Sequence, residues 1–396
     1  MRIEEIRLQN YKCYKKLKIS RIPAMAVFVG ANGTGKSTLF DVFGFLKHCL
    51  TYNVNKAVQS RGGFQELVSR EHRGETIIIE IKFRLNITGV ERLVTYYLEI
   101  AEIDKSIIVN REILRYKRGA HGSPYHFLDY KAGKGYAITN EEDFTKENEE
   151  LTKEYRELEA NDILAIKGLG QFQKFKAANA FRNLIENWHL SDFHINKARG
   201  TKDAVGYDEH LSVSGDNLQL VAHNLFLNHK DIFQKIIKKM QERVPGISSI
   251  EPETTVDGRL LLKFQDGSFK DPFIDKYVSD GTIKMFAYLV MLFDPHPHPL
   301  LCVEEPENQL YPHLLTELAE EFRLYSRHGD QVFVSTHSPD FLNAMELEEV
   351  FWLEKRDGFT EIKRASDDEQ ISAYMLDGDK MGYLWKQGFL GRVNPK

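Results

Sequence analysis

The arrangement of hydrophobic and polar residues predicts two kinds of strand. In ETIIIEIKFRLN, apolar and charged residues alternate from Ile79 to Leu85, and the segments RLVTYYLEI and SIIVNREILRYK follow. A period of two is typical of antiparallel strands that have one solvated face. Continuous apolar runs at residues 24–29 and 300–303, and in QVFVSTHSPDFL, instead predict buried strands. We therefore expect an α/β protein in which an antiparallel β-lobe accompanies a buried sheet.

Helices are predicted after the first buried run and before the second. STLFDVFGFLKHCL follows residues 24–29, TIKMFAYLVMLF precedes residues 300–303, and much of 179–247 is expected to form a mainly helical lobe. The charged stretch EEDFTKENEELTKEYRELEANDILAIKGL places Leu151, Tyr155 and Leu158 at the spacing of one helical face. Ordinary amphipathic packing is the favoured interpretation of that stretch, and a stub of coiled coil is the alternative.

The loop between the first buried strand and its helix matches the pattern G-x-x-x-x-G-K-[ST]. It reads GANGTGKS, from Gly30 to Ser37. Glycines allow successive backbone N–H groups to converge on a phosphate, and the N-terminus of a helix adds partial positive charge. In such a loop, Lys36 reaches the β- and γ-phosphates and the Ser37 hydroxyl binds Mg2+. Because a strand and a helix flank the motif, the sequence predicts a nucleotide-binding P-loop.

Two acidic residues end the second buried strand. A parallel sheet would bring Glu304 and Glu305 to the edge where the P-loop lies. Glu304 is then expected to contact Mg2+, directly or through water, and Glu305 to orient or deprotonate the attacking water. The alternative is one solvent-facing charge and one structural ion pair, since adjacent strand residues point to opposite faces. His337, at the end of a third buried strand, favours the catalytic interpretation because it can contact the γ-phosphate.

A second helix N-terminus carries another anion-binding pattern. SDGT, from Ser279 to Thr282, precedes a strongly apolar helix, and Ser279 is a candidate N-cap. A helix start of this kind can bind an anion. Taken alone, the pattern also fits an ordinary capped core helix.

The order of these motifs resembles that of ABC-type ATPases. The order is the P-loop, SDGT, EE, ENQL and the strand-end histidine. The opening IEEIRLQNYKCYKKLKI, the VSDGT loop and the tail DKMGYLWKQGFLG are similar to the RecF/SMC-like branch, specifically to small predicted bacterial AAA-family ATPases found with anti-phage defence effectors. The resemblance implies an ABC-type P-loop ATPase head with an antiparallel β-lobe and an inserted helical lobe. It also implies that the signature loop of one subunit caps ATP held by the P-loop of another, so that ATP and Mg2+ join a homodimer or higher oligomer.

The resemblance assigns roles to individual residues. Glu304 stands where the commoner pattern has aspartate, and Asp280 and Thr282 replace a glycine and a glutamine of the commoner signature, so the hydrolysis rate stays open. The implied ATP-binding residues are Asn32, Gly33, Gly35, Lys36, Ser37 and Thr38, the metal-binding residues are Ser37, Glu304 and Gln65, the catalytic residues are Glu305 and His337, the signature acting in trans is Ser279, Asp280 and Gly281, and Asn308 lies in the D-loop.

Composition and charge narrow the function classes. The chain has 396 residues, 42% of them hydrophobic, with a formal net charge of -5, so we expect a soluble globular protein. Three scattered cysteines give no disulfide framework and suit a cytoplasmic location, and no apolar stretch approaches membrane-spanning length, so no membrane partner is expected. DNA remains a possible partner through basic residues on one expected helix. These are Lys230, Lys235, Lys238, Lys239 and Arg243.

The loop DPHPHP, residues 294–299, offers His296 and His298 as metal ligands. A proline-rich turn before a buried strand is the better account, because two histidines without further ligands make a poor metal site.

We expect the chain to divide into four segments. They are the N-terminal half of the ATPase head with the P-loop (1–75), the β-lobe (76–140), a mainly helical insertion (141–270) and the C-terminal half of the head with the signature, the Walker B strand and the switch histidine (271–396).

The leading functional hypothesis is an ATPase, an ATP phosphohydrolase that dimerises head to head on ATP. It would act in DNA repair or anti-phage defence with a separately encoded effector, such as a nuclease or a toxin. The alternative is a slowly hydrolysing regulatory scaffold that holds and releases such a partner. Only about 59 residues follow His337, too few for a nuclease domain of ordinary size, so the chain is not expected to cut DNA itself.

Overall fold

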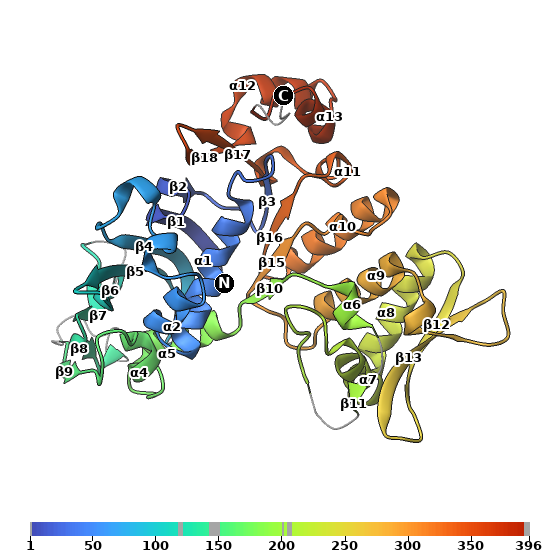
Figure 1. Ribbon diagram of the computed structural model, residues 1–396, viewed down its shortest axis with the longest axis horizontal. Helices are drawn as coiled ribbons and strands as arrows, with labels where there is room; N and C mark the ends of the chain where they lie inside the picture. Colours follow the sequence, from blue (N-terminus) through green and yellow to red (C-terminus); the bar gives the residue numbers. More distant parts are fainter. Residues whose placement is uncertain (1, 118–121, 142–150, 200–201, 204–207, 392–396) are drawn as a thin grey trace.

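Three sheets organise the protein. The structure is a computed structural model that describes residues 2–117, 122–141, 151–199, 202–203 and 208–391. A six-stranded sheet stands in the middle, an eight-stranded sheet lies on one side of it, and a helical lobe with a small third sheet lies on the other (Figure 1). The expected α/β fold with an antiparallel β-lobe is confirmed.

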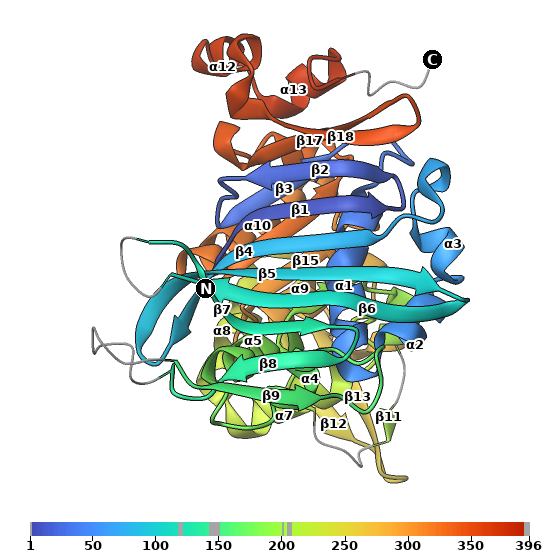
Figure 2. The ribbon, with the colours of Figure 1, turned by 90° about the vertical axis from the view of Figure 1, so that its left-hand side faces the viewer.

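The eight-stranded sheet is antiparallel throughout, as Figure 2 shows from its open side. The predicted alternation holds in its third strand, where Ile79, Ile81 and Phe83 are fully buried. The sheet extends beyond residues 76–140, because the first two strands of the chain and a later strand join it. In spatial order its strands are β2 (Tyr14–Ser20), β1 (Arg2–Tyr11), β4 (Ile77–Ile87), β5 (Val90–Ile103), β6 (Ser106–Tyr116), β7 (Tyr125–Lys131), β8 (Lys134–Ile138) and β9 (Lys153–Glu157).

The helix expected around residues 151–158 is wrong where the structure describes it. Lys153–Glu157 forms the edge strand β9, antiparallel to β8, and the preceding residues 142–150 lie outside the described part of the chain. Tyr155 lies opposite Tyr136, and the Lys153 ammonium lies 4.3 Å from the centre of the Tyr136 ring. A free sheet edge and these cross-strand contacts override the weak helical periodicity. The charged side chains of β9 suit an exposed edge strand.

The six-stranded sheet is parallel except for its last pair. Its short strands contain the continuous apolar runs that predict burial on both faces. In spatial order they are β10 (His189–Ser191), β15 (Leu300–Glu304), β16 (Gln331–Thr336), β3 (Met25–Val29), β17 (Val350–Arg356) and β18 (Phe359–Arg364).

The two faces of this sheet belong to two different hydrophobic cores. In β3, Ala26 and Phe28 pack in the core that lies under the eight-stranded sheet, whereas Val27 and Val29 pack in the core of the helical lobe. Side chains alternate along a strand, so one short strand supplies both cores. The first core contains α1 (Lys36–Thr51), α2 (Val54–Gln59), α3 (Phe64–Leu67), α4 (Ala165–Leu169) and α5 (Lys176–Glu186).

The helical lobe is built on the second core. Its antiparallel hairpin was not expected from the sequence: β12 (Ile247–Thr254) pairs with β13 (Arg259–Asp266), which also pairs with β11 (Lys202–Asp203) and β14 (Phe273–Ile274). No described helix is both long and apolar enough to cross a membrane. The helices on this side and at the C-terminus are α6 (Ile195–Ala198), α7 (Leu218–Asn228), α8 (Lys230–Arg243), α9 (Asp280–Leu292), α10 (Pro312–Arg327), α11 (Pro339–Leu342), α12 (Glu369–Leu376) and α13 (Met381–Lys386).

Candidate active site

The glycine-rich loop joins β3 to α1 and adopts a conformation that glycine permits. Gly33 and Gly35 have φ angles of 78 and 103 degrees, which L side chains rarely adopt. Lys36 is the first residue of α1, and its side chain is buried. Its Nζ donates to the carbonyl oxygen of Gly30 at 2.8 Å and to that of Ala31 at 3.4 Å. The ammonium group is therefore held across the loop, where phosphate oxygens can replace these carbonyl partners.

Side chains from two neighbouring strands hydrogen-bond to the backbone of the glycine-rich loop. The Tyr14 hydroxyl donates to the Gly35 carbonyl at 2.8 Å, and the Thr360 hydroxyl on β18 donates to the Thr34 carbonyl at 2.7 Å. A Cβ atom at Gly35 would lie only 2.6 Å from the sulfur of Cys13, so no larger residue fits there without displacement. Among the remaining expected nucleotide ligands, Asn32, Gly33 and Ser37 are exposed and Thr38 is half-buried.

Ser37 and Glu304 are brought together as the sequence predicts. The Ser37 hydroxyl hydrogen-bonds the Glu304 carboxylate at the end of β15. Burial raises the pKa of Glu304, and the carboxylates of Asp192, Glu305 and Asp41 raise it further. Hydroxyl and carboxylate oxygens are the ligands that Mg2+ prefers, and a cation would relieve the repulsion among these acids. The residues present therefore fit a magnesium site.

The next residue, Glu305, leaves the strand in a strained conformation. Its φ is 42 degrees, in the left-handed region, and its N–H donates to the Ser335 carbonyl of β16 at 2.9 Å. The Glu305 carboxylate accepts a hydrogen bond from Asn308 at 3.2 Å and lies 3.4 Å from Nδ1 of His337. Glu305 and His337, the expected catalytic residues, thus meet Asn308 of the expected D-loop at one sheet edge.

Three charged residues at this edge were not expected from the sequence. Glu307 accepts hydrogen bonds from the Thr336 hydroxyl at 2.8 Å and from the His337 N–H at 2.7 Å, which fixes the histidine turn. Asp192 follows the short strand β10, and Lys284 of α9 donates to the Asn308 carbonyl at 2.7 Å. Glu307 stands inside the recognised ENQL motif, but nothing near Asp192 or Lys284 in the sequence points to this edge.

A pocket opens between these groups. It measures about 450 Å3 and has Asp192, Lys284, Glu304, Glu305 and Asn308 in its lining. Burial lowers the pKa of Lys284 to about 8, although the nearby carboxylates of Glu307, Asp192 and Glu305 oppose that shift. The pocket combines acidic oxygens for a metal ion with a lysine that can face a phosphate.

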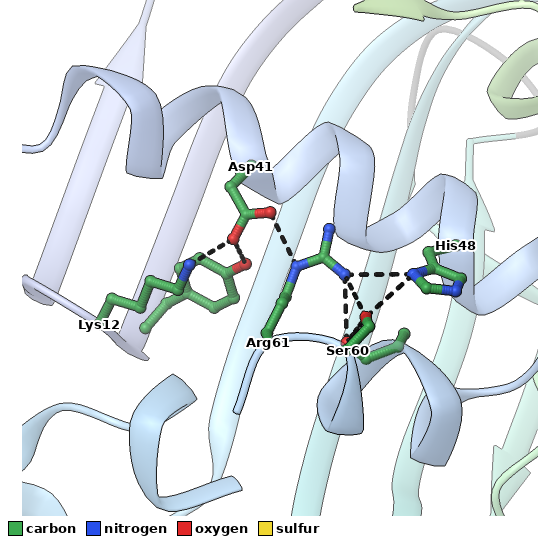
Figure 3. Close-up of polar contacts among 7 residues, drawn as sticks. Lys12, Asp41, His48, Ser60 and Arg61 are labelled. Atoms are coloured by element: carbon green, nitrogen blue, oxygen red, sulfur yellow. Dashed lines mark hydrogen bonds and ion pairs between the residues drawn. The ribbon is translucent and has the colours of Figure 1, made fainter. Parts of the chain in front are cut away.

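One helical turn beyond Ser37, Asp41 ties α1 to two other segments (Figure 3). Its carboxylate accepts hydrogen bonds from the Tyr11 hydroxyl at 2.9 Å, from Lys12 at 2.6 Å and from Nε of Arg61 at 2.7 Å. Burial raises the pKa of Asp41, but the hydrogen bond and the charges of its basic partners outweigh burial and lower it. Charge-assisted bonds of this kind fix the start of the P-loop helix.

The signature residues lie at the N-terminus of α9. As predicted, Ser279 is the N-cap, and its hydroxyl accepts a hydrogen bond from the Thr282 N–H at 3.2 Å. Asp280 pairs with Arg199, and a Cβ atom at Gly281 would lie 2.9 Å from the Gln309 carbonyl oxygen. The signature therefore packs against the Asn308–Gln309 turn of its own chain. In the described residues, no hydrogen bond or ion pair joins it to the P-loop, because α1 and α9 cover opposite faces of the six-stranded sheet.

Gln65 does not join the metal-binding group. It lies on the short helix α3, is exposed, and its amide donates to Glu102 at 2.7 Å. Within the described part of the chain, no hydrogen bond connects it to Ser37 or Glu304. The assignment of Gln65 as a metal ligand stays a prediction without geometric support here.

The basic cluster on α8 is partly neutralised. Lys239 and Arg243 both pair with Glu321 of α10, and the Arg243 side chain is only 8% exposed. Lys230, Lys235 and Lys238 remain exposed. The cluster therefore offers a nucleic-acid backbone fewer charges than the sequence suggests.

A family comparison agrees with this geometry. The sequence model of the family described as "AAA domain, putative AbiEii toxin, Type IV TA system" matches residues 25–343, a span that runs from β3 through α11. The match thus includes the P-loop, the signature, the acidic strand end and His337.

Curated relatives match smaller parts of the chain. The DNA replication and repair protein RecF of Beutenbergia cavernae is 29% identical over 137 residues, which is 33% of this chain and 34% of the relative. RecF of Corynebacterium jeikeium is 33% identical over 55 residues, or 14% of this chain and 13% of the relative. The chain thus spans about a third or less of the length of these relatives.

Solved structures show the same fold over nearly the whole chain. An SMC head bound to the C-winged helix domain of ScpA covers 92% of this chain and 98% of its own, with a TM-score of 0.54 and 16% identity. The Pyrococcus furiosus-derived SMC head with an extended coiled coil, bound to the C-terminal domain of ScpA, covers 94% of this chain and 99% of its own, with a TM-score of 0.52 and 13% identity. The fold is that of an ABC-type ATPase head.

Proposed function

The chain belongs to the family described as "AAA domain, putative AbiEii toxin, Type IV TA system", and from that premise we propose that it binds ATP with Mg2+, closes head to head with a second copy, and hydrolyses ATP in the closed dimer. The observation that carries the proposal is the junction of the P-loop with the acidic strand end. Ser37 contacts Glu304, while Glu305 contacts Asn308 and lies beside His337. These groups are the parts that phosphoryl transfer to water requires.

Each group has a distinct task in this proposal. Lys36 leaves the Gly30 carbonyl and donates to the β- and γ-phosphates. Ser37 and Glu304 hold Mg2+, which when bound neutralises charge on the phosphate oxygens. Glu305 accepts a proton from the attacking water, and its strained backbone with the Asn308 contact fixes the direction of its carboxylate.

The second copy supplies the missing cap. Ser279 presents the N-terminus of α9, where free N–H groups and partial positive charge favour an anion. Because α9 and α1 cover opposite faces of the sheet, a signature that reaches a γ-phosphate is best supplied by another subunit. Lys284 and Gly281 contact the Asn308–Gln309 turn, so a ligand on α9 can be sensed at Glu305 of the same chain.

We further propose that the closed dimer engages DNA or a separately encoded effector in the cytoplasm, and that the chain itself is no nuclease. RecF relatives carry DNA replication and repair in their names, and the family description includes a toxin–antitoxin system. Turnover stimulated by DNA would support action on DNA. Little turnover together with ATP-stabilised assembly would support a regulatory scaffold. Cleavage of plasmid DNA by the purified protein would overturn the exclusion of nuclease activity.

The proposal is tested by the mass of the protein in solution. Glu305→Gln, measured with ATP and Mg2+, should double in mass, because water activation is lost while ATP binding is kept. Adding Ser279→Arg should block the doubling, whereas the matched exposed control Ser123→Arg should leave it unchanged. A doubling that persists with Ser279→Arg, or no doubling at all, would overturn the shared-site dimer.

A further inference from the structure

Three side chains outside the ATPase site gather where the helical lobe meets the central sheet. His210 precedes α7, Asp294 follows α9, and His298 precedes β15. One ligand atom from each lies within 4.8 Å of the others. Two histidines with one carboxylate form a donor set used by transition metals such as zinc and iron.

The two ligands from the DPHPHP loop are already oriented by hydrogen bonds. Nδ1 of His298 lies 3.0 Å from the Asn187 carbonyl oxygen, and a carbonyl only accepts, so Nδ1 carries the proton and Nε2 keeps its lone pair. Oδ1 of Asp294 accepts a bond from the His296 N–H at 2.8 Å, while Oδ2 lies 2.7 Å from Nδ1 of His210. Metal-binding histidines usually donate their second nitrogen in this way, which fixes ring and tautomer.

The surroundings of His210, Asp294 and His298 favour a bound cation between these three side chains. The Asp294 side chain is only 3% exposed, and such a carboxylate is costly to bury without a positive partner. His210 is 34% exposed, which leaves a path for an ion and for a water ligand. His189 is buried and stacks on His298 with ring centres 4.7 Å apart, so the His298 ring is held in place.

We propose that His210, Asp294 and His298 hold a divalent transition-metal ion, with zinc the best fit, and that water completes its coordination. Imidazole nitrogen and carboxylate oxygen suit Zn2+, which takes three protein ligands and one water at open sites. The ion joins the segment before α7 to the turn between α9 and β15. The signature lies at the start of α9, and Glu304 and Glu305 lie at the end of β15. It is separate from the magnesium ion proposed at Ser37.

This site is not predicted from the sequence, because the DPHPHP loop alone offers only His296 and His298 as histidine ligands. In the folded chain His296 is exposed and lies outside the group of ligands. Asp294 of the same loop and His210 from a distant part of the chain lie beside His298 instead. His296 therefore serves as a matched control: it stands on the same loop and has the same side chain, but it is outside the ligand group.

The test uses tag-free, full-length protein stripped with a chelator and titrated with Co2+, a spectroscopic substitute for Zn2+. We expect intense visible d–d bands typical of four-coordinate Co2+, saturating at one ion per chain and bleached when Zn2+ displaces it. His298→Gln and His210→Ala should each weaken binding by about 100-fold or more, since even changes to the partners of metal ligands cost 10–100-fold. His296→Gln should bind as the parent protein does.

Thermal unfolding gives a second readout if a variant folds poorly. Zn2+ should raise the melting temperature of the parent and of His296→Gln but not that of His298→Gln, because only a folded site binds the ion. Three results would each overturn the proposal. They are weak Co2+ spectra of the octahedral type, a loss of binding in His296→Gln equal to that in His298→Gln, and an unchanged affinity in His298→Gln and His210→Ala. In that case the cluster is a His210–Asp294 ion pair and no metal site.

Discussion

The P-loop edge of the central sheet and the N-terminus of α9 are both suited to meet phosphate, but they differ in what one chain provides. At the P-loop edge, the Ser37 hydroxyl contacts Glu304 at the end of β15, and Lys36 lies close enough to Glu304 and Glu305 to feel their charges. The start of α9 carries a capped serine, and its contacts within the chain run to the Asn308–Gln309 turn. Parallel strands bring functional side chains of one chain together because all their carboxyl ends share an edge. The start of α9 lies on the opposite face, and in the proposed dimer it meets the phosphate of the second copy.

Lys36→Ala should have the largest effect, because it removes the ammonium group that binds phosphate at the P-loop edge. Loss of charge-assisted bonds to two phosphates costs about 3 kcal/mol or more, which is roughly a 100-fold weaker affinity for ATP. Calorimetric titration with ATP and Mg2+ measures it. Unchanged tight binding by a folded Lys36→Ala protein would contradict the P-loop assignment.

Glu305→Gln should separate hydrolysis from binding at the same edge. Without the carboxylate that accepts the proton of water, turnover should fall by about 100-fold to 10,000-fold while ATP binding persists. Phosphate release and ATP affinity are measured on the same preparation, with the exposed Glu348→Gln as a matched control. An unchanged rate would remove Glu305 from this role.

Mixing two inactive variants tests whether the two regions belong to different subunits. Ser279→Arg should lose roughly 100-fold of turnover, as expected when a positioned donor to the reacting phosphate is removed. Mixed with an equal amount of Lys36→Ala, it should recover turnover roughly tenfold or more above that of either variant alone, since only a pair made of one copy of each variant has a complete site. If the mixture stays inactive while both proteins are folded, the signature does not act in trans.

The sequence predicts those features of the molecule that depend on a local pattern of residues. The P-loop, the Ser279 cap, the β15 and β16 strand ends and the alternation in β4 could all be predicted, because each is encoded in a few consecutive residues. Asp192 and Lys284 could not, because only the pairing of β10 with β15 and the packing of α9 bring them to the pocket. Strand β9 was missed for the same reason, since a free sheet edge decided its conformation.

The pH dependence of activity offers the finest test, through Lys284, which belongs to α9 but faces the P-loop edge. Its pKa of about 8 means that the nucleotide-free protein loses this positive charge as pH rises through 8, beside the carboxylates of Glu305, Glu307 and Asp192. We therefore expect kcat/KM for ATP to fall about threefold to tenfold between roughly pH 7.5 and 9, since a group that must be protonated is lost at tenfold per unit above its pKa. Lys284→Arg, whose guanidinium stays charged, should flatten the profile.

Deprotonation of Lys284 should change protein stability in the opposite direction to activity. Measuring both therefore distinguishes loss of the Lys284 charge from unfolding. Because the pKa of Lys284 in the folded state lies below its ordinary value of 10.5, the unfolded chain binds the proton more strongly, and Lys284 adds to the free energy of unfolding as pH rises from about 8 to 10.5. A fall in kcat/KM over this range that accompanies an unchanged or higher melting temperature therefore reports lost charge at the phosphate pocket. A fall that persists in Lys284→Arg would instead belong to Lys36, whose pKa is also lowered by burial. The coupling of α9 to the phosphate would then rest on the packing of α9 against the Asn308–Gln309 turn and not on the charge of Lys284.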